Sequence, residues 1–255
     1  MKRIAVLASI AAMLLSLIAV ARADELKVLS AGTMNFALKD VGDNFTRKTG
    51  TQLAITFGGA GGIKTKFEKG EPADVGILLK PDIAALVRAG KIAPDSVHDI
   101  ARTELSIAVR KGQPKPDISS LAGVKKALLA AKTIAYYDAA AGGAADGTLA
   151  EHDFARLGIA NEVAAKAKLW KSVQEVIAEK SAELLVGWQP PLLSKAADYE
   201  FVGPLPPELQ DPEHSTWTAG AATKAADLGA AKGFTQFLAS PESLGVFKSK
   251  GFAPP

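Results

Sequence analysis

Short apolar runs alternate with amphipathic helical stretches along the chain, and few folds accommodate such a pattern. Three strand–helix pairs come first, with strands at 26–29, 53–57 and 73–79 and helices at 35–49, 62–69 and 81–90. Strands separated by helices are typical of a parallel sheet whose faces are covered by those helices. We therefore expect an α/β fold.

The alternation continues after a break at Lys111–Pro116, which we interpret as a crossing between two lobes. A further strand is expected at 105–110, before the break. Beyond the break we expect helices at 121–130, 148–157 and 173–180, and strands at 133–137 and 183–186. Residues 204–212 hold four prolines and predict no helix. Residues 216–223 would return the chain to the first lobe, and two helices follow, the second capped by Ser240.

Residues 1–23 have the pattern of a secretory signal peptide. Lys2 and Arg3 precede a long apolar run, and Ala21-Arg22-Ala23 offers a cleavage site of small residues. We expect a cleaved signal and a periplasmic protein, with an uncleaved anchor as the alternative. No later stretch is long and apolar enough to predict stable membrane insertion.

Charge and cysteine content exclude several classes of function. The chain has 30 Lys+Arg and 27 Asp+Glu, and the signal takes three of the basic residues, so the mature chain has no formal net charge. The basic balance is thus no argument for nucleic acid. With no cysteine, a disulfide framework, a thiol nucleophile and Cys-ligated metal are all impossible.

The glycine-rich stretch FGGAGGIKTKF, residues 57–67, comes close to a phosphate-binding P-loop. The P-loop pattern requires glycine at the position of Ile63, so nucleotide hydrolysis is disfavoured. A simpler physical reading remains, because a glycine turn before a helix leaves the first helical N–H groups free to bind an anion.

Similar turns occur at Ser30–Thr33 and at Gly142–Thr148. In a parallel sheet such turns meet at the carboxyl ends of the strands, where ligands bind. Several such turns in one chain favour a cleft for a small anionic ligand over tight turns alone.

Catalytic motifs are scarce. His98, His152 and His214 are isolated, and Asp138 and Asp146 flank a glycine-rich loop without an evident nucleophile. We therefore expect no enzyme activity, no catalytic residue, no metal and no permanent cofactor. An exported enzyme with Asp138, Asp146 or His152 as acid or base remains the alternative.

The export signal, the segment from LKVLSAGTMNF to ADVGILL and the closing FLASPESLGVFKSKGF carry a family resemblance. The chain resembles the periplasmic substrate-binding proteins of ABC transporters, in the molybdate-binding-like branch. The resemblance implies a two-lobed, type II periplasmic-binding fold. Each lobe would have a mixed, mostly parallel sheet flanked by helices, and two hinge crossings would join the lobes. It also implies lobe 1 at 24–109, lobe 2 at 110–216 and a return to lobe 1 at 217–255.

Binding positions follow from the resemblance. It implies ligand contacts in lobe 1 at Gly32, Thr33, Gly59, Ala60 and Gly61, and in lobe 2 at Ala145, Asp146, Gly147, Val173 and Trp188. Thr33 keeps the hydroxyl that the family's oxyanion-binding serine supplies, whereas Ala60 lacks the second hydroxyl and Trp188 replaces a tyrosine.

These departures favour a small organic acid over molybdate or tungstate, because a buried oxyanion needs a full shell of hydrogen-bond donors. Lys64 or Lys66 could add positive charge. We expect a monomer that captures a small anion and delivers it to the permease of an ABC importer. A molybdate- or tungstate-specific protein and a ligand sensor on the same scaffold are further alternatives.

Overall fold

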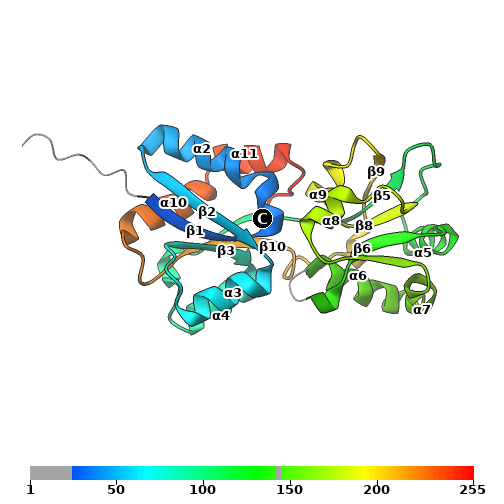
Figure 1. Cartoon of the computed structure of the whole chain (residues 1–255), viewed down its shortest axis with the longest axis horizontal. Helices are drawn as coiled ribbons and strands as arrows, with labels where there is room; N and C mark the ends of the chain where they lie inside the picture. The colour runs from blue at the N-terminus through cyan, green and yellow to red at the C-terminus, as the bar shows by residue number, and fades with distance from the viewer. Residues whose placement is uncertain (1–24, 142–144) are drawn as a thin grey trace, which may run out of the picture.

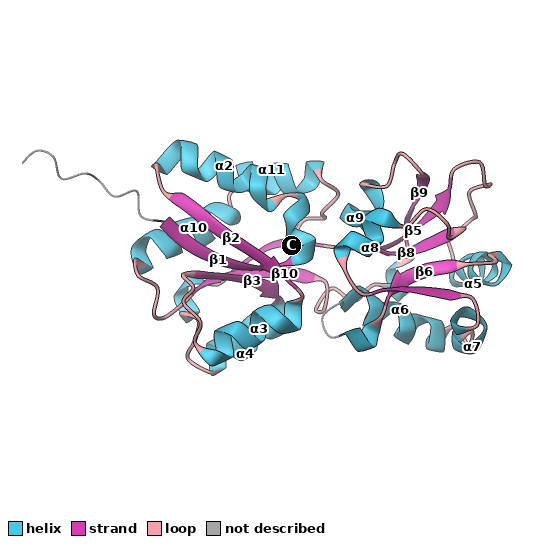
Figure 2. Ribbon diagram, viewed as in Figure 1, coloured by secondary structure: helices cyan, strands magenta, loops and turns pink. Residues whose placement is uncertain are grey.

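The computed structural model describes residues 25–141 and 145–255, and Figure 1 shows two lobes side by side. The predicted signal peptide and residues 142–144 lie outside the described residues. Each lobe is built on one five-stranded sheet with helices on both faces, as Figure 2 shows. The expected α/β fold with two lobes is confirmed.

Lobe 1 contains both ends of the described chain. Its sheet has the order β2-β1-β3-β10-β4. The strands are β1 (Glu25–Ala31), β2 (Gln52–Gly58), β3 (Val75–Leu79), β4 (His98–Arg102) and β10 (Thr216–Ala221). The helices are η1 (Gly32–Phe36), α2 (Leu38–Thr49), α3 (Ala60–Lys69), α4 (Lys80–Arg88), η2 (Pro94–Ser96), α10 (Leu228–Leu238) and α11 (Pro241–Ser249).

Lobe 2 repeats this architecture, with the sheet order β7-β6-β8-β5-β9. The strands are β5 (Leu105–Arg110), β6 (Ile134–Tyr137), β7 (Ala167–Trp170), β8 (Leu184–Trp188) and β9 (Tyr199–Pro204). The helices are α5 (Leu121–Ala130), η3 (Ala139–Ala141), α6 (Ala145–Arg156), α7 (Ala160–Ala164), α8 (Val173–Ala178), α9 (Gln189–Leu193) and η4 (Pro207–Leu209).

Both sheets are mostly parallel, as predicted. In lobe 1 only β10 runs against its neighbours, since it is antiparallel to both β3 and β4. In lobe 2 β5 has the same role between β8 and β9. The carboxyl ends of the other four strands therefore meet at one edge of each sheet.

Local sequence signals explain where several helices begin or end. Gly50 and Gly70 adopt the left-handed conformation directly after α2 and α3, which glycine reaches without a steric penalty. Ser240 accepts a hydrogen bond from the backbone of Ser243 and is followed by proline, so α11 begins where the sequence predicts.

Each lobe has its own apolar core. In lobe 1, strand and helix side chains pack around Phe45 and Phe234, whose ring centroids are 4.8 Å apart. In lobe 2, Tyr136 packs edge-on against Phe154 at 5.2 Å. Two separate cores allow the lobes to behave as rigid bodies that move about the crossings between them.

The first of the two crossings between the lobes lies at a different place from the one that the sequence predicts. Strand 105–110, which we placed in lobe 1, is β5 and pairs with β8 and β9 in lobe 2. The first crossing is therefore at Thr103–Glu104, and residues 111–116 form a loop within lobe 2. Turn residues mark a loop, but only sheet pairing decides to which lobe a strand belongs.

The two crossings run side by side. The backbone N–H of Thr103 donates to the carbonyl of Ser215 over 3.0 Å. The Gln210 side chain both accepts from the Leu105 N–H and donates to its carbonyl, each over 2.9 Å. These bonds connect the return segment to the outgoing one at the junction of the lobes.

Several short elements were missed because their sequences lack a clear period. They are β4, β7, β9, α7 and α9. Within the described ranges, no helix is long and apolar enough to cross a membrane.

Candidate functional site

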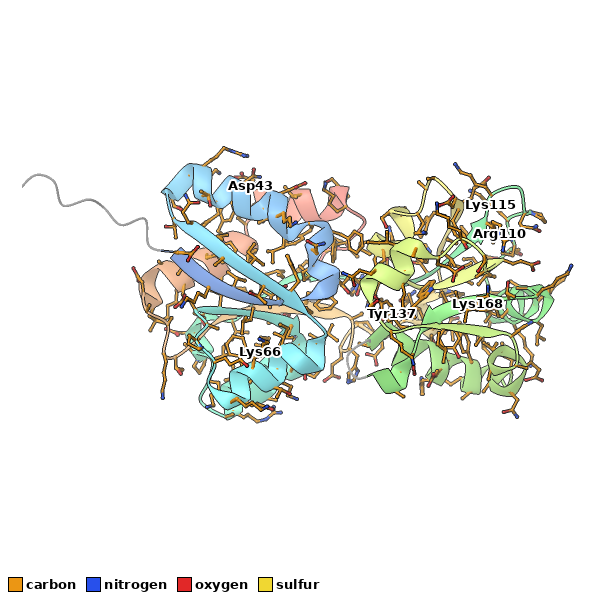
Figure 3. The ribbon with its side chains drawn as sticks, viewed as in Figure 1. Asp43, Lys66, Arg110, Lys115, Tyr137 and Lys168 are labelled. Carbon is orange, nitrogen blue, oxygen red and sulfur yellow. The ribbon has the colours of Figure 1, made fainter. Side chains whose placement is uncertain are left out.

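A cavity of about 290 Å³ lies between the lobes, and both contribute to its wall. Lobe 1 lines it with residues 31–33, Asn35, 57–60, Leu79 and Trp217. Lobe 2 lines it with Tyr137, Ala145, Asp146, Lys171, Ser172, Gln174 and Trp188. Figure 3 labels Tyr137 on the side of lobe 2 that faces lobe 1.

Strand ends generate this lining. Ala31, Gly58 and Leu79 are the last residues of β1, β2 and β3, and Tyr137 and Trp188 are the last residues of β6 and β8. Ligands bind at this edge in α/β sheets, because loops and helix N-termini converge there. The cavity has the position of a binding cleft.

The lobe 1 wall contains an uncapped helix N-terminus. Gly59 precedes α3, no side chain caps the helix, and its first turn has no acidic residue. The first intrahelical bond runs from the Ile63 N–H to the Gly59 carbonyl, so the three preceding N–H groups have no partner in the helix. This end of α3 offers partial positive charge to an anion.

The lobe 2 wall contains a helix N-terminus that is already occupied. Asp146 lies in the first turn of α6 and is 3% exposed. Its carboxylate accepts a hydrogen bond from the Trp188 N–H over 3.4 Å. The nearby N–H groups of Asp146 itself and of Gly147 act on its pKa in the same direction as this bond. The start of α6 thus already lies next to a carboxyl group of the protein itself.

Burial dominates the acidity of Asp146. Loss of hydration raises its pKa to about 7 in spite of these backbone hydrogen bonds, which act in the opposite direction. A carboxyl group with such a pKa can both accept and return a proton near neutral pH. Asp146 therefore has the properties of an acid–base group, and it lines the cavity.

Glycine at position 147 makes room for this arrangement, and Gly187 lies close to the carboxyl group of Asp146. A Cβ at Gly147 would lie 2.4 Å from the Tyr137 carbonyl oxygen, so only glycine lets α6 start this close to β6. A Cβ at Gly187 would lie 3.4 Å from Oδ2 of Asp146. Gly147 is not part of the cavity lining, but its lack of a side chain lets the start of α6, with Asp146, lie against β6.

Lys171 brings positive charge to the cleft. It is the cationic side chain that lines the cavity in the described ranges, and no ion pair engages it there. The turn that carries it is fixed, because Ser172 accepts from the Glu175 N–H and the Glu175 carboxylate accepts from the Lys171 N–H. Lys64 and Lys66 do not line the cavity and instead pair with Asp82 and Glu71.

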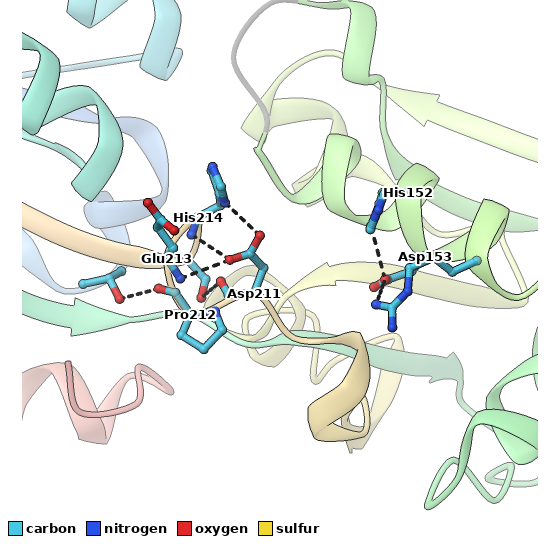
Figure 4. Close-up of polar contacts among 9 residues, drawn as sticks. His152, Asp153, Asp211, Pro212, Glu213 and His214 are labelled. Carbon is cyan, nitrogen blue, oxygen red and sulfur yellow. Dashed lines mark hydrogen bonds and ion pairs between the residues drawn. The ribbon is translucent and has the colours of Figure 1, made fainter.

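The other acid–base candidates lie outside the lining. Asp138 accepts a bond from the Ala140 N–H, as a turn residue does. Figure 4 shows the exposed ring of His152 next to Asp153, at 3.8 Å, while His214 contacts Asp211 at 2.7 Å. Burial raises the pKa of Asp153 to about 6, although Arg156 and His152 oppose the shift.

The structure brings most of the sequence-predicted positions together. Gly32, Thr33, Gly59, Ala60, Ala145, Asp146 and Trp188 line the cavity. Gly61 and Gly147 lie beside it in the first turns of α3 and α6, and Val173 begins α8 after Ser172. Ligand contact at these positions stays a prediction.

Sequence reasoning missed other residues of the lining. They are Asn35, Tyr137, Lys171, Ser172, Gln174 and Trp217. Tyr137 could have been found, since it ends a predicted strand. Trp217 could not, because it enters from β10 after a separation of many residues. Its indole N–H donates to Thr103 at the first crossing, over 3.2 Å.

A search of characterised proteins found a relative that is an enzyme by name. A Pseudomonas protein named aconitate isomerase is 30% identical over 237 residues, which cover 90% of this chain and 87% of that protein. Our expectation of no enzyme activity is wrong by this comparison. That expectation rested on the absence of a recognisable pair of catalytic groups in the sequence, and the burial of a single carboxyl group such as Asp146 leaves no such signal.

Solved structures confirm the fold. The periplasmic molybdate-binding protein of Azotobacter vinelandii matches with a TM-score of 0.73 at 21% identity, over 90% of this chain and 99% of that one. The sulfate-binding protein SubI of Mycobacterium tuberculosis matches with a TM-score of 0.69 at 19% identity, over 91% and 87%. The type II periplasmic-binding fold follows from both matches.

A model of the bacterial extracellular solute-binding protein family matches residues 26–253 of this sequence. Together with the two-lobed fold and the cleft, this match shows that the chain belongs to that family of bacterial extracellular solute-binding proteins.

Proposed function

We propose that the protein binds a small polycarboxylate between its lobes and isomerises it by moving a proton, with Asp146 as the proton carrier. The observation that carries this proposal is a buried carboxyl group, with its pKa raised to about 7, in the cleft wall. The relative named aconitate isomerase supports aconitate as the substrate class.

Carboxylates of the substrate have complementary groups on both walls. The uncapped start of α3 and the Thr33 side chain offer hydrogen-bond donors on lobe 1. Lys171 offers a positive charge on lobe 2. Two carboxylates held by opposite lobes would place the carbon chain between them, next to Asp146.

One proton transfer group is sufficient for the reaction. In aconitate a methylene group lies between a carboxylate and a carbon–carbon double bond. When Asp146 takes a methylene proton, the C–H electron pair delocalises over the three-carbon unit and the end carboxylates. Return of the proton to the other end carbon shifts the double bond and regenerates the Asp146 carboxylate. The composition of the substrate does not change, so no co-reactant is needed.

The geometry of the product follows from how the ligand is held. The new double bond forms between the central carbon and the carbon that lost its proton. Its cis or trans form depends on where the cleft fixes the carboxylate of that carbon. Binding on two rigid walls thus controls the outcome, while Asp146 supplies the proton transfer.

Nuclear magnetic resonance of the purified protein with cis- or trans-aconitate in deuterium oxide tests the proposal. We expect interconversion of the two isomers and solvent deuterium at the methylene carbon. If correctly folded protein converts neither cis-aconitate nor trans-aconitate into the other isomer, the proposal is overturned. Heat-inactivated protein is the control for spontaneous exchange.

Delivery of the bound anion to an ABC importer is a second candidate, favoured by membership of an extracellular solute-binding family. It is compatible with catalysis, since binding precedes both. Uptake of labelled ligand by vesicles containing a candidate permease, with and without this protein, tests it. We infer a periplasmic location from the signal-like N-terminus, and processing at residues 23–24 in cells checks that inference.

Molybdate or tungstate as the ligand is the less favoured alternative, because Ala60 offers no hydroxyl to complete a donor shell. A thermal-shift series with aconitate, molybdate and tungstate separates these ligands. A ligand at 100 times its dissociation constant stabilises the folded state by about 2.7 kcal/mol. Stabilisation by molybdate but not by aconitate would reverse our preference.

A further inference from the structure

Tyr137 has the features of a second functional group in the cleft. It is the last residue of β6 and lines the cavity beside the start of α6. Its ring packs edge-on against Trp170, with the centroids 5.9 Å apart. The close approach of Gly147 to its carbonyl oxygen fixes its backbone. The ring is therefore held by Trp170, and its backbone by the start of α6.

The hydroxyl group of this ring has no protein partner among the described residues, whereas that of Tyr199 donates to the Ala182 carbonyl over 3.0 Å. Tyr136, one residue earlier, points to the opposite face of the sheet and packs against Phe154 in the lobe 2 core. Of the tyrosines, Tyr137 alone lines the cavity. Its hydroxyl is thus available to a ligand.

The surroundings keep this phenol protonated. Burial raises the pKa of Tyr137, and the negative charges of Asp146 and Glu175 act in the same direction. A neutral phenol is a good hydrogen-bond donor to a carboxylate. Both residues line the cavity, and Gly147, next to Asp146, adjoins the Tyr137 carbonyl oxygen, so the donor and the proton carrier lie on the same wall.

Resting on the isomerase proposal, we infer that Tyr137 is a further catalytic residue, which donates a hydrogen bond to the substrate carboxylate next to the carbon that loses its proton. When the C–H bond breaks, part of the electron pair moves onto that carboxylate. A donor aimed there is bound more tightly in the transition state than in the ground state, so it accelerates the reaction.

Tyr137→Phe removes the hydroxyl and keeps the ring that packs on Trp170. Tyr136→Phe is the matched control, since it makes the same change one residue away and outside the cavity. We expect kcat for aconitate isomerisation to fall by about tenfold to a thousandfold in Tyr137→Phe, as for loss of one oxyanion donor. KM should change less than about threefold, and Tyr136→Phe should match the wild type.

Other outcomes separate the two proposals. An active wild type with equal kcat in Tyr137→Phe would overturn the role of Tyr137 and leave the isomerase proposal intact. A raised KM with unchanged kcat would also overturn it, because it would assign the hydroxyl to ground-state binding alone. If the wild type binds aconitate in calorimetry without isomerising it, the proposed function and the catalytic role both fail. A Tyr137→Phe binding measurement would then locate the hydroxyl contact.

Discussion

The two walls of the cleft have similar secondary structure, but the helix that begins at each wall differs in the charge of its first turn. In both lobes a strand ends, glycines follow or adjoin, and a helix of ten residues or more begins at the cavity, α3 in lobe 1 and α6 in lobe 2. The start of α3 has no acidic residue, whereas the start of α6 holds the buried Asp146. One wall is therefore suited to receive an anion, and the other to exchange a proton.

On the proposed function, this difference separates the wall that binds the ligand from the wall that reacts with it. Two donor-rich helix ends would hold an anion and do nothing further. One acidic residue in the first turn of a helix uses that helix end for itself, and burial keeps its pKa near neutrality.

Asp146→Asn should have the largest effect, because it removes the proton carrier and keeps the size of the side chain. We expect the isomerisation rate to fall by about 10²- to 10⁴-fold. Stopped assays by chromatography of the two aconitate isomers measure it. Unchanged turnover in this variant would show that Asp146 is not the proton carrier. The proposed division into a binding wall and a reactive wall would then fail.

The pH dependence of stability tests the buried carboxyl independently of any substrate. Its pKa is about 7 in the folded protein and 3.8 in an ordinary environment, so the folded state holds the proton more tightly. Its contribution to stability is thus lost as pH rises from about 4 to about 7, amounting to roughly 4 kcal/mol.

Urea unfolding at pH 5 and pH 8 measures this slope. The wild type should lose more unfolding free energy between the two pH values than Asp146→Asn does. Asp153, whose pKa is also raised, contributes in the same direction in both proteins and cancels in the comparison. Identical slopes would mean that the Asp146 carboxyl titrates normally.

Gly147→Ala and Gly62→Ala compare the two helix starts directly. A Cβ at Gly147 meets the Tyr137 carbonyl oxygen at 2.4 Å, whereas one at Gly62 meets nothing within 4 Å. We expect Gly147→Ala to destabilise the protein by about 1–3 kcal/mol. Gly62→Ala should be neutral or stabilise by about 0.4–1 kcal/mol. Thermal unfolding of both variants measures the contrast, and equal effects would contradict it.

Lys171→Gln should have a smaller effect, confined to binding. Loss of its charge should raise KM for aconitate about tenfold, which corresponds to about 1.4 kcal/mol, and change kcat little. Lys168→Gln is the control, because that lysine contacts Ser181 outside the cavity. A KM that does not respond to Lys171→Gln would assign carboxylate binding to lobe 1 alone.

The amino-acid sequence determined most of the strands, the major helices and the edge of the sheet where the cavity lies. The signals used were the spacing of apolar residues, the glycines that end helices and the Ser240 cap. All of them are local, so they can be recognised without knowledge of distant contacts. Thr33, Ala60 and Trp188 were placed at the cleft by the family resemblance, and the structure shows that each follows or ends a strand there.

Only the tertiary structure decided the chemistry of the site. Asp146 looks like an ordinary turn residue in the sequence, and its pKa is raised because it is buried against β8, which comes from a distant part of the chain. The pairing of β5 with β8 likewise moved a whole strand to lobe 2. Hydration and strand pairing depend on residues far apart in the chain, whereas helix ends and apolar periods depend on near neighbours.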